Sequence, residues 1–121
     1  MVATNIEAEG RKPADIAAIY RAFVEACTAR GLTQAQIFEA IDTGTHLPAS
    51  LGRIPSHVFE RCESEKSSDP HIANNARRTR LMRTAKALVD IYCEQTRVSD
   101  IATGARGLAR LIAQGARLYE R

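Results

Sequence analysis

The chain has 121 residues, enough for one domain, and 45% of them are hydrophobic, which excludes wholesale disorder. No run of about 18 apolar residues occurs, so we expect no transmembrane helix, and residues 1–12 lack the apolar segment of a secretory signal. The net charge of +3 is unevenly distributed: residues 1–69 hold seven Lys and Arg against ten Asp and Glu, whereas residues 70–121 hold ten against four. A mildly acidic part therefore precedes a strongly basic one, and any function must account for this.

Three cysteines, Cys27, Cys62 and Cys93, lie far apart in apolar or helical stretches. An odd number of cysteines without a CxxC pair argues against a disulfide framework and against a zinc ribbon. We expect free thiols and a cytoplasmic location.

The first part of the chain is predicted to be a loose leader over residues 1–12, followed by a three-helix unit over residues 13–69. The first helix, residues 14–30, has apolar residues at the spacing of one helix face, and Gly31 ends it. A second, short helix begins after the N-cap Thr33 and ends near Gly44.

Residues 43–54, with Pro48 and two glycines, are predicted to form a loop. Pro55 can then open a third helix that places Val58, Phe59 and Cys62 inward.

The basic part, residues 70–121, is predicted to be a helical hairpin of the same domain. Asp69 as N-cap and Pro70 at the first helical position start a helix that runs to about Thr96, and Ser99 caps a last helix over residues 100–119. Because the connection between the two helices is short, we expect antiparallel neighbours. The predicted fold is a single all-α domain of five helices without strands.

The last helix contains a repeat, in which Gly-Ala-Arg at residues 104–106 recurs at residues 115–117. A spacing of eleven residues is almost three turns, so equivalent residues share a face. One face is small, through Ala105 and Ala109, and another carries the arginine line Arg106, Arg110, Arg117 and Arg121. We predict an interface here, with a homodimer as one form of it. The alternative is a packing helix with solvated arginines.

Two segments carry a family resemblance. FVEACTARGLTQAQIFEAI, residues 23–41, resembles the start of Cro/C1-type (phage-repressor-like) helix-turn-helix domains, and LGRIPSHVFERCESEK, residues 51–66, resembles their turn and recognition helix. The resemblance covers residues 16–66. It implies that Gln34 contacts backbone phosphates and that the exposed recognition-helix positions face the major groove, namely Ser56, His57, Glu60 and Arg61. The alternative is a helical hairpin that uses common capping residues.

Five cations lie within ten residues of the fourth predicted helix: Arg77, Arg78, Arg80, Arg83 and Lys86. We expect them to cover a broad face opposite Leu81, Ala85 and Leu88. Arginine suits phosphate recognition, and such a patch would hold nucleic acid through contacts that do not depend on base sequence. The alternatives are a solvated face or pairing with the acidic part of the same chain.

No nucleophile, metal-ligand or phosphate-loop pattern is present, so we expect neither an enzyme nor a metal or other cofactor. The leading hypothesis is a small nucleic-acid-binding protein, a regulator associated with duplex DNA. The rival is a protein-interaction module, such as an inhibitor, antiactivator or immunity-type protein, that docks on an acidic or helical partner protein. Neither hypothesis involves a membrane.

Overall fold

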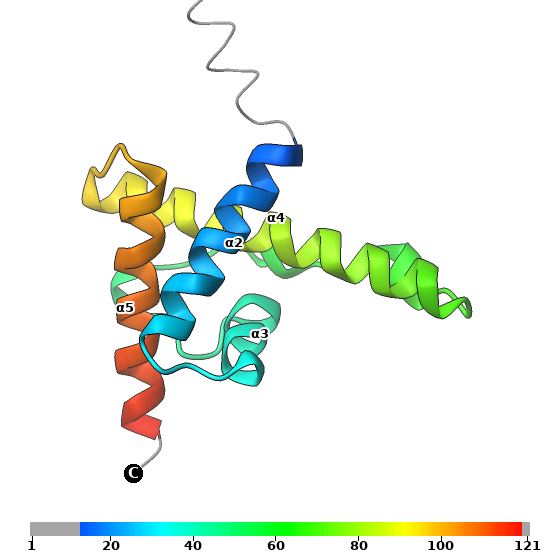
Figure 1. The fold of residues 1–121 in the computed structure, drawn as a ribbon, viewed down its shortest axis with the longest axis horizontal. Helices are drawn as coiled ribbons and strands as arrows, with labels where there is room; N and C mark the ends of the chain where they lie inside the picture. The colour runs from blue at the N-terminus through cyan, green and yellow to red at the C-terminus, as the bar shows by residue number, and fades with distance from the viewer. Residues whose placement is uncertain (1–12, 120–121) are drawn as a thin grey trace, which may run out of the picture.

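The computed structural model describes residues 13–119, which are all-helical (Figure 1). Four α-helices and three short 3-10 helices follow one another: α2 (Pro13–Ala29), α3 (Gln34–Thr43), η1 (Ala49–Leu51), η2 (Ser56–Phe59), η3 (Glu63–Lys66), α4 (Pro70–Thr96) and α5 (Ile101–Tyr119). The all-α prediction is confirmed, since this range contains no strand. None of its helices is long and apolar enough to cross a membrane. The predicted leader, residues 1–12, and Arg121 of the arginine line lie outside the described residues.

Two helix starts predicted from capping residues are confirmed, those of α3 and α4. The predicted cap of α5 is wrong, because the carboxylate of Asp100, and not Ser99, accepts from the Thr103 N–H at 3.3 Å. The Thr33 side chain accepts a hydrogen bond from the Gln36 N–H, and the Gln36 side chain accepts one from the Thr33 N–H, which closes a capping box. Asp69 caps α4 by accepting from the His71 N–H at 2.9 Å. At the other end of α3, Gly44 takes the left-handed conformation with φ 79° and ends the helix.

The predicted third helix is wrong, because its segment forms η2 and η3 joined by extended backbone at Glu60 and Cys62. A continuous α-helix would require the Cys62 N–H to donate to the Val58 carbonyl. In the structure both groups have other partners. The Val58 carbonyl accepts from the Thr84 hydroxyl of α4 at 2.8 Å, and the Cys62 N–H donates to the Glu65 carboxylate at 2.7 Å. The chain therefore has four α-helices in its described part, not five.

The expected antiparallel hairpin of the last two helices is also not seen, because α5 runs across α4 and packs more extensively on α2 (Figure 1). Two glycines of α5 permit this close crossing. A Cβ atom at Gly104 would lie 2.1 Å from the Cys93 Sγ, and one at Gly107 would lie 2.4 Å from the Tyr92 hydroxyl oxygen. Gly104 of the repeat thus serves packing within one chain.

The small face of α5 is part of the core and is not a free interface. Ala105 and Ala109 are 0% exposed, and they pack in a cluster with residues of α2, α3 and α4 such as Phe23, Ile41 and Leu88. The prediction that these two alanines lie at an interface between two copies is therefore wrong. Hydrophobic burial against the neighbouring helices of the same chain already uses that face.

The close approach at Gly104 predicts that one substitution there destabilises the native protein but stabilises a variant that lacks the Cys93 sulfur. In the native chain, Gly104→Ala places a methyl group against the Cys93 sulfur, and overpacking of this kind costs about 1–3 kcal/mol. In a Cys93→Ala background the sulfur is gone, so the same substitution is expected to add about 1 kcal/mol through the higher helix propensity of alanine. Urea unfolding of the four proteins of this cycle measures both effects. Destabilisation of the same size in both backgrounds would contradict the packing described here.

Candidate functional site

The five cations of α4 do not share one face. At 100° per residue, Arg77 lies one turn before the buried Leu81, whereas Arg83 lies across the helix from it. Arg77, Arg78 and Arg83 are exposed, Lys86 is half-buried, and Arg80 is only 4% exposed. The expected broad face opposite the core side of α4 is therefore wrong.

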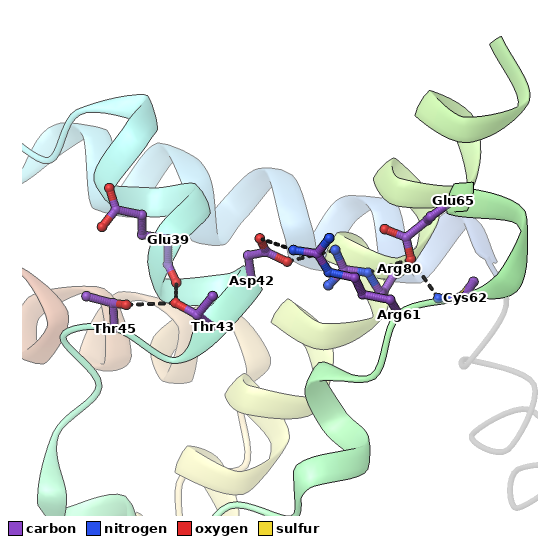
Figure 2. Close-up of polar contacts among 8 residues, drawn as sticks. All are labelled: Glu39, Asp42, Thr43, Thr45, Arg61, Cys62, Glu65 and Arg80. Carbon is purple, nitrogen blue, oxygen red and sulfur yellow. Dashed lines mark hydrogen bonds and ion pairs between the residues drawn. The ribbon is translucent and has the colours of Figure 1, made fainter. Parts of the chain in front are cut away.

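Arg80 binds carboxylates of its own chain. Its Nη2 lies 2.7 Å from the Asp42 Oδ1, and its Nε lies 2.7 Å from the Glu65 Oε2 (Figure 2). Partial burial would by itself raise the pKa of Glu65, but the hydrogen bonds from Arg80 and from the Cys62 N–H hold that pKa below its usual range. Arg61 adds a weaker pairing with Asp42 at 3.6 Å. The prediction that Arg80 contacts phosphate is wrong, because its charge already joins α3 and η3 to α4.

The other four cations of this set differ in their surroundings. Lys86 pairs with Asp90 one turn along α4. Arg77 and Arg78 lie near the Tyr20 ring of α2: burial raises the pKa of Tyr20, and the two guanidinium groups partly oppose that rise. No carboxylate of the described residues lies within ion-pair distance of Arg77, Arg78 or Arg83. These three are the arm arginines.

The arginines Arg77 and Arg78 belong to a segment that projects from the helical bundle. The first turns of α4 extend to one side of the molecule, with η3 packed along them (Figure 1). We call residues 70–83 the arm, and its last turn carries the buried Arg80 and Leu81. Residues 70–79 contain no buried side chain. The arm also exposes the amides of Asn74 and Asn75 and contains no Phe, Tyr or Trp. Hydrogen-bond donors and positive charge are thus concentrated on the exposed side chains of the arm.

The residues implied by the helix-turn-helix resemblance are all exposed, but they are not brought together. Gln34 begins α3, whereas the η2 turn that holds Ser56 and His57 packs at the other end of that helix, where Phe59 contacts Gly44. Ser56 and His57 lie on the 3-10 turn η2, whereas Glu60 and Arg61 lie on the segment between η2 and η3, and Arg61 is paired with Asp42. These residues therefore do not form one surface that could contact a DNA groove.

A second group of arginines lines a cleft of about 240 Å³ between α2, α4 and α5. Arg106 and Arg110 come from the predicted arginine line, and the structure adds Arg30 at the end of α2. Arg117, also of that line, is exposed and donates to the Arg30 carbonyl at 3.2 Å. The i, i+4 spacing on α5 predicted Arg106 and Arg110 as neighbours on one face. Arg30 was missed, because a single cation before a helix-ending glycine is common.

Other reactive groups are inert or dispersed. Cys27, Cys62 and Cys93 are free thiols, and burial raises the pKa of Cys27 to about 12, so this thiol is not a nucleophile at neutral pH. Burial, followed by the charges of Asp90 and Asp100, also raises the pKa of Cys93. Among the described residues, no three His, Cys, Asp or Glu side chains are grouped so that they could hold a metal ion. The two arginine groups are therefore the main candidate sites.

Comparison with known proteins identified no relative of this chain. Nothing in it tests the resemblance to Cro/C1-type domains, which stays a prediction. No protein-family model, curated protein or solved structure matches the chain.

Proposed function

We propose that the protein binds nucleic acid without catalysing a reaction, and that the arm arginines contact the phosphates of a DNA duplex in a regulatory role. The observation that carries this proposal is the exposure of Arg77, Arg78 and Arg83 without an ion-paired carboxylate in the described chain. Guanidinium groups in this state are available to phosphate oxygens, and neutralising phosphates releases condensed counterions.

The shape and composition of the arm favour a duplex over a single strand. Single-strand binding proteins stack bases on large aromatic side chains, and residues 70–83 contain no Phe, Tyr or Trp. The first turns of α4 project from the bundle with η3 along them, and their exposed side chains can face a duplex (Figure 1). Asn74 and Asn75, exposed one turn before the arginines, provide further donors for phosphate or base edges.

Titration of a labelled DNA duplex at two salt concentrations tests the proposal. Each phosphate contact contributes about 0.9 to the slope of log K against log salt, so Arg77→Gln with Arg78→Gln is expected to lower the slope by about two. The affinity at low salt should fall by about tenfold or more, uniformly across base sequences. Fluorescence anisotropy measures both quantities.

A control variant with the same net charge as the arm variant distinguishes the effect of the arm on binding from the effect of the overall charge. Arg53→Gln with Arg97→Gln removes two exposed arginines outside the arm and is expected to leave the slope nearly unchanged. If this control weakens binding as much as the arm variant does, or if the native protein binds no duplex at low salt, the proposal is wrong.

A protein-interaction module remains the second candidate, and one observation favours it. A groove of about 790 Å³ lies between residues 44–49 and the last turns of α5, and its apolar lining includes Leu47, Pro48 and Leu111. A helix of a partner protein could place apolar side chains there. This candidate requires indifference to nucleic acid at low salt, so the same titration decides between the two.

A further inference from the structure

The cleft lined by Arg30, Arg106 and Arg110 has the composition of an anion site, and we call it the arginine pocket. Its lining also includes Tyr92 of α4 and Thr103 of α5, but no carboxylate. Its volume of about 240 Å³ is small for a drug-sized ligand and leaves room for a phosphate group with part of its substituent.

One hydroxyl at this cleft is not used by the fold. Tyr92 is 8% exposed, and its phenol makes no hydrogen bond with any residue of the described range. The hydroxyl oxygen itself is not fully buried, so it can meet a partner in the cleft. The close approach of Gly107, where a Cβ atom would lie 2.4 Å from this oxygen, leaves space for the hydroxyl beside the cleft. Tyr92 can therefore donate to a ligand without losing an internal bond.

The guanidinium groups are held in part by the backbone and by neighbouring hydroxyls. Arg30 donates through Nη1 to the Ala26 carbonyl at 3.1 Å, and Arg106 donates through Nη2 to the Thr103 hydroxyl at 3.2 Å. Thr103 in turn donates to Asp100, and this hydrogen bond is the largest of the causes that lower the pKa of Asp100. No carboxylate of the described residues lies within ion-pair distance of these arginines, although the charge of Arg106 also helps to lower the pKa of Asp100. Most of their N–H donors therefore remain available.

We propose that the arginine pocket binds a phosphate monoester, with Arg30, Arg106 and Arg110 around the dianion and Tyr92 donating a hydrogen bond. The paired N–H donors of a guanidinium group match two phosphate oxygens in geometry. A phosphate dianion offers enough acceptors for several guanidinium groups at once. This site is separate from the arm. Arg77 and Tyr92 are 15 positions apart on α4, which places them about 22 Å apart along the helix axis.

Binding of inorganic phosphate, followed by NMR chemical shifts, tests the site without nucleic acid. Arg106→Gln with Arg110→Gln is expected to weaken phosphate binding by about tenfold or more. Tyr92→Phe removes only a hydroxyl that has no partner in the described chain, so it should weaken binding several-fold at an unchanged thermal midpoint. The matched control, Arg21→Gln with Arg53→Gln, removes two exposed arginines that do not line the cleft and should bind as the native protein does.

Two short oligonucleotides identify the source of the phosphate. Tighter binding of a 5′-phosphorylated strand than of its 5′-hydroxyl form, abolished by the Arg106 and Arg110 substitutions, assigns the pocket to a nucleic-acid end. Equal binding of the two strands, together with binding of inorganic phosphate, assigns it to a small phosphate compound. If phosphate does not bind below about 10 mM, or if the Arg106 and Arg110 variant binds it as tightly as the native protein, the pocket is not a phosphate site. Duplex binding through the arm can fail or succeed independently of these results.

Discussion

Ala109→Glu is expected to unfold the protein. Ala109 is 0% exposed in the middle of α5, where the helix packs against α2 and α4. A glutamate there must bury a charge without a partner or take up a proton, and it must also displace close-packed neighbours. We expect a loss above about 4 kcal/mol, a large part of the about 5–15 kcal/mol that stabilises a typical domain. Circular dichroism and urea unfolding measure this loss.

The neighbouring residue provides the matched control for Ala109→Glu. Arg110→Glu puts the same side chain on the exposed side of α5 and should change stability by less than about 1 kcal/mol. A folded Ala109→Glu protein whose only change is a lower sedimentation coefficient would instead mean that the alanine face joins two copies, and the packing described here would be wrong.

Arg80→Met is expected to destabilise the protein by about 3 kcal/mol at neutral pH. The side chain of Arg80 is 4% exposed, and it pairs with Asp42 and Glu65, whose side chains are 15% and 8% exposed. Removing one partner of a buried ion pair leaves uncompensated charge and costs about 3–5 kcal/mol. The lower end applies because Arg61 still lies 3.6 Å from Asp42, and the Cys62 N–H still donates to Glu65. Urea unfolding at pH 7 measures the change.

The pH dependence of that loss checks its cause. The pKa of Glu65 in the folded protein is lowered, so the stability that its charge contributes is complete above the unfolded pKa of about 4.3 and is lost as the pH falls further. In Arg80→Met the carboxyl groups can protonate at low pH and no longer bury a charge. The difference between the two proteins should therefore shrink as the pH falls from 7 towards 4. A difference that stays constant over this range would assign the loss to packing and not to the ion pairs.

Capping residues made much of the fold predictable. Pro70–Thr96 is both the predicted and the observed range of α4, because Asp69 and Pro70 act locally and their effect can be read from adjacent residues. The η2 and η3 turns could not be predicted in this way. Their form depends on Thr84, which binds the carbonyl of Val58 from 26 positions away. Contacts between residues so far apart in the sequence cannot be predicted from local propensity or from hydrophobic spacing.

The same physical limit applies to the candidate site. Helical spacing placed Arg106 and Arg110 on one face of α5, and both are exposed there. Spacing could not distinguish the buried Arg80 from the exposed Arg78, since the difference lies in carboxylates contributed by α3 and η3. Tyr92 continues the helical spacing of Leu81, Ala85 and Leu88, which predicts an apolar position. Only the packing of Gly107 against its ring shows that its hydroxyl remains available.

The projection of the arm has a consequence for how the molecule opens. Because residues 70–79 bury no side chain, the first turns of α4 can fray without breaking the core formed by residues from Leu81 onward. Their amide protons should exchange with solvent through local opening, whereas those of Leu88 and Val89 exchange only when the whole domain unfolds. A ligand that orders the arm would thus add protection there and leave the exchange of the core amides governed by global unfolding.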